Sequence, residues 1–317
     1  MDKLKTLDII SSAFNEEECI PEFFFRVKKV MSTETEYDYR ILMIDNGSTD
    51  STWKIISLAA KKDARIVGNR MSRNFSLDAA FTNGLDSATA ECAIIMASDL
   101  QDSPEAIPKL LRKFEEGYDQ VLVKVTSREF VPIVRRTLTR IFYWVANKMT
   151  SGMLPQSVSD FRLLSRPAYQ AINQLRESHR FIRGLGAWVG FKSTEIESVR
   201  EPRFAGKSKW LSKSIFEVIS HASSSILAHS SKPLTWIAAS GLFLGTSSAI
   251  IVFFLAIYWI FFGVPFAGFG TLVGIIFVGF SLFMLCIGVM AQYLGLIYEE
   301  VKKRPLYIVA ETTKNKE

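Results

Sequence analysis

Acidic and amide side chains gather in three short stretches of the first third of the chain, at residues 13–18, 45–50 and 99–102. Carboxylate and amide oxygens hydrogen-bond sugar hydroxyls and suit hard cations such as Mg²⁺ or Mn²⁺. Each stretch alone is explained equally well by a helix cap or a turn. Together they predict a site for a base, a ribose and a metal-bound diphosphate.

The elements that hold these stretches alternate between strand and helix. Helical patterns occur at 51–62, where Trp53, Ile56 and Ala60 share one face, and from Ser103-Pro104 to Gly117. The alternation predicts an α/β domain with a mainly parallel sheet, whose ligands bind at the carboxyl ends of the strands. The β-rich runs are residues 7–13, 39–45, 64–69, 92–98 and 119–126.

The apolar residues are concentrated near the end of the chain. All 317 residues include 38 basic and 32 acidic side chains, yet residues 233–298 contain no Asp, Glu, Lys or Arg. Because about 20 residues cross a bilayer, this run predicts two transmembrane helices, at about 233–262 and 266–298. A purely soluble protein is excluded. The absence of ionisable groups in both spans argues against a transporter or a channel.

Basic residues flank both predicted spans. Lys232 precedes the first, and Lys302, Lys303 and Arg304 follow the second. By the positive-inside rule, we expect a multi-pass protein of the cytoplasmic (inner) membrane whose catalytic domain and both termini are cytoplasmic.

Two further segments, 124–148 and 208–231, combine basic residues with apolar stripes of helical spacing. They are interpreted either as helices packed on the domain or as helices at the lipid headgroups. The predicted organisation is a catalytic domain at 1–207 with an interface helix at about 130–148, a juxtamembrane amphipathic helix at 208–231, two transmembrane helices at 232–298 and a cytoplasmic tail at 299–317.

Other classes of site lack support. The three cysteines, Cys19, Cys92 and Cys286, form no disulfide framework, and no P-loop is present. The glycines at 184, 186 and 190 have the wrong spacing for a dinucleotide fingerprint, which disfavours a Rossmann dehydrogenase.

Six motifs stand in order along the chain. They are Phe14-Asn15-Glu16-Glu17, Asp45-Asn46-Gly47-Ser48-Thr49-Asp50, Ser72-Arg73-Asn74-Phe75, Asp99-Leu100-Gln101-Asp102, Ser159-Asp160-Phe161-Arg162-Leu163 and Arg203-Phe204-Ala205-Gly206-Lys207-Ser208-Lys209. This order resembles that of the family 2 glycosyltransferases of GT-A fold, and among them the polyprenyl-phosphate sugar transferases, which include bactoprenol glucosyltransferases and dolichol-phosphate mannose synthase. The resemblance covers almost the whole chain.

The resemblance implies roles for individual residues. Asp99, with Gln101, would hold Mg²⁺ or Mn²⁺ on the donor diphosphate and serve catalysis. The nucleotide sugar would contact Phe14, Glu16, Asp45, Asn46 and Ser48. Phosphate of the donor or the lipid would be bound by Arg128, Arg136, Arg162, Arg203, Ser208 and Lys209.

Asp160 corresponds to the proposed catalytic carboxylate of the family. A phosphate monoester has its second pKa at about 6 and is largely dianionic at neutral pH, so it hardly needs a base. Two roles for Asp160 therefore stay open: a general base, or a group that orients a sugar hydroxyl or an arginine such as Arg162.

The sequence departs from the family pattern at three places. Ala97 stands where the metal motif usually has its first acid, and Asp45-Asn46 replaces an Asp-Asp or Asn-Asp pair. Ser76-Leu77 replaces the Gly-Lys of the bactoprenol enzymes. These departures affect metal affinity and donor identity rather than the fold.

The expected function is inverting transfer of a hexose from a nucleotide sugar, UDP-glucose or a related UDP-sugar, to undecaprenyl phosphate. The product would be a lipid-linked monosaccharide for O-antigen or cell-envelope glycosylation. Expected partners are the donor, the lipid acceptor, the bilayer and further copies of the chain, with a tetramer as one candidate, but no nucleic acid. The alternatives are a degenerate, non-catalytic scaffold and a polysaccharide synthase. The synthase is disfavoured because the chain has no Gln-x-x-Arg-Trp motif and too few spans for a pore.

Overall fold

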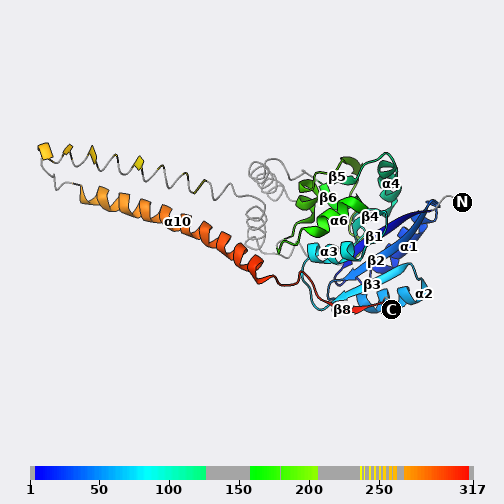
Figure 1. Cartoon of the computed structure of the whole chain (residues 1–317). Coiled ribbons are helices and arrows are strands. Elements are labelled where there is room, and N and C mark those ends of the chain that lie inside the picture. The colour runs from blue at the N-terminus through cyan, green and yellow to red at the C-terminus, as the bar shows by residue number, and fades with distance from the viewer. Residues whose placement is uncertain are drawn as a thin grey trace.

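The computed structural model of the chain describes residues 4–125, 158–178, 180–205 and 268–313, and scattered positions between 236 and 262. An α/β domain carries the described residues up to 205, and a long helical arm extends from it (Figure 1). The chain returns from this arm to the domain and ends beside its sheet (Figure 1).

The centre of the domain is a mixed sheet of eight strands in the order β7-β5-β6-β4-β1-β2-β3-β8. Strands β6 and β8 run antiparallel to their neighbours, and the other pairings are parallel. The mainly parallel sheet is therefore confirmed. The strands are β1 (Lys5–Ala13), β2 (Tyr37–Asp45), β3 (Ile66–Met71), β4 (Cys92–Ala97), β5 (Gln120–Val125), β6 (Val158–Ser165), β7 (Ser193–Ser198) and β8 (Val309–Thr312).

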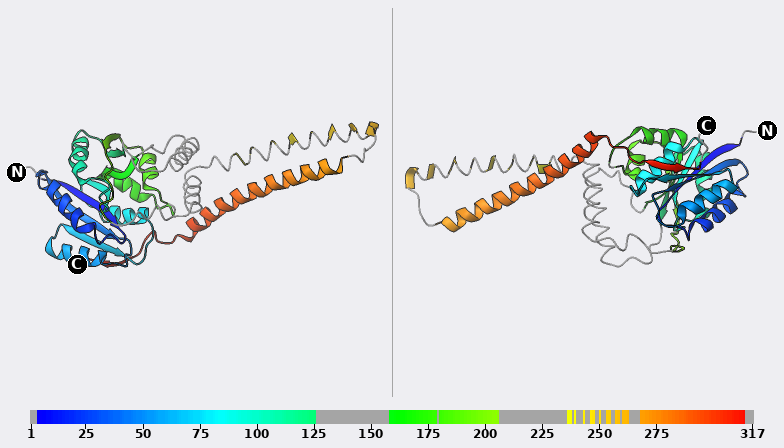
Figure 2. Two further views of the ribbon diagram at one scale, coloured as in Figure 1. Left: turned by 180° about the vertical axis from the view of Figure 1, so that it is seen from behind. Right: turned by 90° about the horizontal axis from the view of Figure 1, so that it is seen from below.

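Helices cover both faces of the sheet (Figure 2). One buried cluster joins α1, α2 and α4 to one face, and a second joins α3, α6 and α7 to the other. This sandwich explains why β4 is apolar throughout and why β1 is buried from Leu7 to Ala13, since both faces of these strands are covered. The helices are α1 (Ile20–Met31), α2 (Thr52–Lys62), α3 (Leu77–Ser87), the short 3₁₀ helix η1 (Pro104–Ala106), α4 (Ile107–Glu115), α6 (Arg166–Gln174) and α7 (Ile182–Trp188).

Helix α2 confirms the predicted apolar face, because Ile56 is buried and both Trp53 and Ala60 pack against the same cluster. The third strand was expected at 64–69 but forms at Ile66–Met71. The difference has a local cause: the carboxylate of Asp63 accepts hydrogen bonds from the backbone N–H of Arg65 (3.1 Å) and from its side chain (3.0 Å). This turn delays the strand by two residues.

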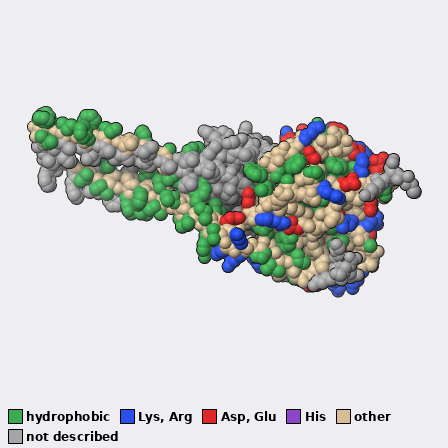
Figure 3. All heavy atoms as spheres, in the orientation of Figure 1, with side chains coloured by type: hydrophobic (Ala, Val, Ile, Leu, Met, Phe, Trp, Pro, Cys, Tyr) green, Lys and Arg blue, Asp and Glu red, His purple; other side chains and the backbone are tan. Residues whose placement is uncertain are grey.

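The arm contains helix α10 (Phe269–Lys302), 34 residues long. Among the described residues, the segment Leu282–Lys302 of this helix is the one candidate span: it is long enough and apolar enough to cross a membrane. Large apolar side chains such as Phe280, Phe283 and Met290 are exposed along it, and the described side chains of the arm are mostly green in Figure 3.

The other predicted membrane elements have less support. The described positions between 236 and 262 are all helical, but the first predicted span as a whole stays a prediction. The predicted helices at 130–148 and 208–231 lie outside the described residues. Residues 299–317, expected only as a tail, include the end of α10 and the sheet strand β8.

Strands β1, β2 and β4 run parallel and end at one edge of the sheet, at Ala13, Asp45 and Ala97. β1 begins near the labelled N-terminus, far from the arm, and runs towards the side of the domain from which the arm departs (Figure 1). The edge that carries the three polar stretches therefore lies on the arm's side of the domain.

Candidate functional site

The loops after β1 and β2 hold each other through backbone-to-side-chain hydrogen bonds. The hydroxyl of Ser48 accepts the N–H of Asn15 at 2.9 Å, and the hydroxyl of Thr52 accepts the N–H of Glu16 at 2.9 Å. In return, the amide oxygen of Asn15 accepts the N–H of Thr49 at 2.8 Å. The two predicted polar stretches therefore meet as one preformed cradle, and Ser48 is a structural part of it.

The loop after β2 also lies against the loop after β3. Gly47 has φ +73°, and a Cβ on it would come within 2.4 Å of the carbonyl carbon of Arg73. The side-chain amide of Asn46 donates to the carbonyl of Ser76 (3.0 Å) and accepts the N–H of Phe75 (3.0 Å). Asn46 thus joins two loops, and its predicted contact with the base stays a prediction.

Asp45 is fully buried at the end of β2. Its Oδ1 accepts the N–H of Ser48 at 3.0 Å, whereas Oδ2 has no hydrogen-bond partner and lies 3.5 Å from Nε of Arg70. Burial raises the pKa of Asp45, and the bonds to Ser48 and the charge of Arg70 oppose that rise. Buried polar atoms rarely lack a partner, so Oδ2 is an acceptor available to a ligand N–H or hydroxyl.

Glu16, Asp99 and Arg203 meet from three separate loops. Nη2 of Arg203 donates to both carboxylate oxygens of Glu16, at 2.5 and 2.6 Å, and Nη1 lies 3.9 Å from Oδ2 of Asp99. Oδ1 of Asp99 accepts the N–H of Gln101 at 3.2 Å. One guanidinium therefore faces two carboxylates, in a position where a diphosphate would compete with them for it.

Asp160 lies on β6 and forms an ion pair with Arg183 of α7, at 2.8 Å. Nearby, Asp102 is buried and accepts the hydroxyl of Ser159 at 3.2 Å. Burial is the main cause that raises the pKa of Asp102 to about 6, with Arg200 opposing it and the charges of Asp99 and Asp160 adding to it. The hydrogen bond between Asp102 and Ser159 joins the loop that carries Asp99 to the strand that carries Asp160, so the three carboxylates belong to one region of the edge.

Arg162 lies beneath this region with 1% of its surface exposed. It donates to the backbone carbonyls of Ser159 (3.2 Å) and Asp160 (3.3 Å), and burial lowers its pKa to about 10. A Cβ on Gly186 would lie 3.1 Å from its Nη1, so this glycine makes room for the guanidinium. Arg162 supports the strand that carries Asp160, and its predicted phosphate contact stays a prediction.

Of the remaining predicted site residues, one is described by the structure and four are not. Phe14 is half-buried directly after β1, at the edge described above. The predicted phosphate ligands Arg128, Arg136, Ser208 and Lys209 lie outside the described residues.

Sequence reasoning missed two arginines, Arg183 and Arg70. Arg183 stands immediately before the 184–190 glycine pattern, and Arg70 lies two residues before the Ser72-Arg73 motif, so proximity to a motif was the only available signal. Neither spacing reveals its carboxylate partner, because those pairs form only through the fold.

The side chains at this site supply only part of the ligands that a divalent ion needs. Within the described residues, no three His, Cys, Asp or Glu side chains are arranged to hold a metal. Asp99 nevertheless provides an oxygen ligand beside the position expected for a diphosphate. Mg²⁺ is commonly held by one or two carboxylates, substrate phosphates and water, so this chemistry fits an ion completed by the donor.

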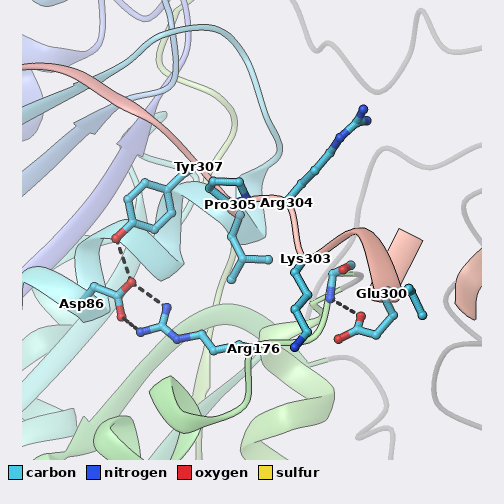
Figure 4. Close-up of a pocket in the computed structure, with 10 residues that line it drawn as sticks. Asp86, Arg176, Glu300, Lys303, Arg304, Pro305 and Tyr307 are labelled. Carbon is cyan, nitrogen blue, oxygen red and sulfur yellow. Dashed lines mark hydrogen bonds and ion pairs between the residues drawn. The ribbon is translucent and has the colours of Figure 1, made fainter. Parts of the chain in front are cut away.

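A separate cavity of about 750 Å³ lies where α10 meets the domain (Figure 4). There the carboxylate of Asp86 accepts from both guanidinium nitrogens of Arg176, at 2.7 and 2.8 Å, and from the hydroxyl of Tyr307 at 2.8 Å. These bonds anchor the segment after α10 to the domain.

The sheet order, with acidic loops at the carboxyl ends of its strands, is that of an α/β domain of GT-A type. The model of glycosyl transferase family 2 matches residues 8–173, and the chain belongs to this family. It is a glycosyltransferase.

Relatives match over nearly the whole chain. An uncharacterized glycosyltransferase of Synechocystis is 36% identical, over 96% of this chain and 95% of its own. The SfII prophage-derived bactoprenol glucosyl transferase of Shigella flexneri is 34% identical, over 96% of this chain and 98% of its own. The prophage bactoprenol glucosyl transferase homolog of Escherichia coli is 34% identical, over 97% of this chain and 99% of its own.

A solved structure shares the fold at low sequence identity. Glucosyl-3-phosphoglycerate synthase of Mycobacterium tuberculosis, in complex with Mn²⁺, UDP and phosphoglyceric acid, has a TM-score of 0.50 and 15% identity, covering 71% of this chain and 77% of its own. This likeness supports the GT-A assignment and nothing finer.

Proposed function

We propose that the chain transfers one glucose or related hexose from a UDP-sugar to undecaprenyl phosphate, with inversion at the anomeric carbon. The observation that carries this proposal is the 34% identity, over 96% of the chain, to a bactoprenol glucosyl transferase. The site is compatible with it, because carboxylates for a nucleoside and a cation for phosphate meet at one edge of the sheet.

The nucleoside is proposed to bind between the loops after β1 and β2. The unpartnered Oδ2 of Asp45 would accept a hydrogen bond from the base or the ribose. Asn15, Asn46 and Gly47 fix the cradle in advance, so little ordering is needed on binding.

The departing diphosphate is proposed to lie between Asp99 and Arg203. Arg203 would leave Glu16, at least in part, and neutralise charge that develops on the leaving group. Asp99, with Gln101, would hold Mg²⁺ or Mn²⁺ there, and that ion supplies further neutralisation of the diphosphate. The hydrogen bond from the backbone N–H of Gln101 to Oδ1 of Asp99 restrains this carboxylate, which supports the proposed role.

Asp160 is proposed to act as an orienting group rather than as a base. Its carboxylate is already paired with Arg183 at 2.8 Å, and a dianionic phosphate acceptor carries no proton that must be removed. The pair would instead place a cation near the incoming phosphate while Asp160 holds a sugar hydroxyl. The phosphate oxygen then forms the bond to the anomeric carbon as the bond to the diphosphate breaks.

Helix α10 is proposed to anchor the enzyme in the cytoplasmic membrane together with a second span at about 233–262, and both termini would be cytoplasmic. The organisation expected from the sequence, with headgroup-level helices near 130–148 and 208–231, belongs to the same proposal. Holding the site at the headgroup level would raise the effective concentration of the lipid acceptor.

The experiment supplies the membrane-embedded protein with UDP-[¹⁴C]glucose, Mn²⁺ and undecaprenyl phosphate. We expect label in the chloroform extract that depends on the added lipid and is absent with Asp99→Asn protein. Label in aqueous polymer would favour a polysaccharide synthase. Absence of product with every UDP-sugar tried would favour a scaffold.

A further inference from the structure

Strand β8, the last described strand of the chain, brings the carboxylate of Glu311 close to the proposed nucleoside site. β8 pairs antiparallel with β3 so that Glu311 stands opposite Arg70, 241 positions earlier in the chain. The carboxylate of Glu311 accepts from Nη1 of Arg70 at 2.8 Å and from Nε1 of Trp53 at 2.9 Å. Glu311 is therefore held by α2 and in turn holds Arg70.

The same guanidinium reaches the nucleoside end of the site. Nε of Arg70 lies 3.5 Å from Oδ2 of Asp45, the buried oxygen without a hydrogen-bond partner, and Nη2 lies 3.5 Å from the carbonyl of Ser48. Arg70 thus spans the distance from the C-terminal strand to the loop that begins the donor cradle.

The arrangement has a physical consequence for Asp45. A half-exposed arginine has many rotamers, and a fixed partner at its tip restricts them. Burial raises the pKa of Asp45, Asp50 adds to the rise, and Ser48 and Arg70 oppose it. The position of Arg70 therefore influences both the orientation of the Asp45 carboxylate and its charge.

We propose that β8 completes the donor site, because Glu311 fixes Arg70 and Arg70 orients the Asp45 carboxylate for the nucleoside. Arg70 and Glu311 act as positioning residues. The inference rests on the proposed use of a nucleotide sugar. It makes donor binding dependent on a segment that follows the membrane-spanning helix.

The test measures UDP affinity by calorimetry on full-length protein in nanodiscs. Arg70→Gln should weaken UDP binding about tenfold, the scale of one charge-assisted interaction. Glu311→Ala should weaken it about threefold, and the double variant should bind no worse than Arg70→Gln alone, because Glu311 acts through Arg70.

A matched control comes from the same strand segment. The hydroxyl of Thr313 accepts the N–H of Gly68 at 2.8 Å, two residues from Arg70. Thr313→Val should lower thermal stability slightly and leave UDP affinity unchanged, since it removes one side-chain hydrogen bond while the pairing of β8 with β3 and the contacts of Glu311 stay in place.

The pH dependence separates positioning from mere structural support. Without the Arg70 charge, the pKa of Asp45 rises further, so Arg70→Gln should lose UDP affinity at a higher pH than wild type as the pH falls. Arg70→Lys keeps the charge and should restore the wild-type pH profile, although not the full affinity, because it lacks the planar fork.

Three results would overturn the inference: wild-type affinity in Glu311→Ala, additive losses in the double variant, or a loss in Thr313→Val equal to that in Glu311→Ala. If the wild type binds neither UDP nor another nucleotide, the proposed function itself fails. If the wild type binds UDP and the Arg70 and Glu311 variants match it, only this inference fails.

Discussion

The two ends of the candidate site differ in how their carboxylates are paired. At the nucleoside end, Asp45 is buried with one oxygen free of hydrogen bonds, and its nearest cation stands 3.5 Å away. At the diphosphate end, Glu16 is bonded to Arg203 at 2.5 Å and Asp160 to Arg183 at 2.8 Å. If the donor binds as proposed, the first end would accept its nucleoside without losing a hydrogen bond, whereas the second would exchange partners with its diphosphate.

This contrast predicts how donor fragments bind. A nucleoside should gain hydrogen bonds at Asp45 without breaking any, because Oδ2 has none to lose. A diphosphate must displace carboxylates from Arg203, so its net contribution to affinity should be modest even though each phosphate contact is strong. The cation released from Glu16 is then placed where leaving-group charge develops.

The largest expected effect is that of Asp99→Asn. It removes the carboxylate assigned to the metal-bound diphosphate, which should cost several kcal/mol of transition-state stabilisation. We expect the transfer rate to fall about a thousandfold or more, while the melting temperature measured without UDP stays at the wild-type value. Activity within threefold of wild type would remove Asp99 from the mechanism.

The pair Asp160 and Arg183 comes next. A general base contributes about 10²–10⁴ in rate, and only the carboxylate would matter in that case. As an orienting pair, Asp160→Asn and Arg183→Gln should each lower kcat about 10²-fold, without moving the acid limb of the pH–rate profile. If Asp160→Asn lost the acid limb of the pH–rate profile and Arg183→Gln stayed nearly as active as wild type, Asp160 would be identified as a general base.

Arg203→Gln tests the exchange of partners. Affinity for UDP should fall about tenfold because a phosphate-binding cation is lost, and affinity for uridine should stay unchanged. Asp45→Asn is the matched variant at the other end, where uridine and UDP should be weakened equally. Equal losses of uridine and UDP in Arg203→Gln would show that Arg203 supports the whole site rather than the diphosphate.

The smallest effect on activity is expected from Asp78, at the start of α3. Burial, aided by the charge of Asp160, raises its pKa to about 6, and its carboxylate accepts the N–H of Ile182 at 3.0 Å. Because the folded protein holds this proton more tightly than the unfolded chain, stability falls as pH rises from about 4 to 6 and stays lower above that.

Asp78→Asn keeps an acceptor oxygen and removes the charge. Relative to wild type, its free energy of unfolding should therefore be higher by about 1–3 kcal/mol at pH 8 than at pH 4.5. Denaturant melts at both pH values measure this difference. If the free energy of unfolding of the variant differed from that of wild type by the same amount at both pH values, Asp78 would be ionised equally in the folded and the unfolded protein.

The sequence predicted most of the frame of this site. The runs before Ala13, Asp45 and Ala97 each contain a short stretch of apolar residues followed by polar ones, so the strands and their polar ends were readable without a structure. Strand β6 was not predicted as a strand, although its motif was recognised, because it runs antiparallel and lies outside the alternating pattern.

The pairings of charges were beyond the sequence. Arg203 and Glu16 stand 187 positions apart, and nothing local indicates that they meet. Arg162 was expected at a phosphate, whereas its burial and its carbonyl partners depend on the packing of α7 against the sheet. Strand β8 was read as a tail because a four-residue strand gains its order only from the edge of β3.

The mass of the lipid that the purified enzyme produces is the most direct test of single hexose transfer to a lipid phosphate. Protein in nanodiscs receives undecaprenyl phosphate, UDP-glucose and Mn²⁺, and the organic extract is analysed by mass spectrometry. We predict a lipid heavier by one hexose residue, formed by wild type and not by Asp99→Asn. Unchanged lipid, or a series of lipids carrying several hexoses, would contradict single transfer to a lipid phosphate.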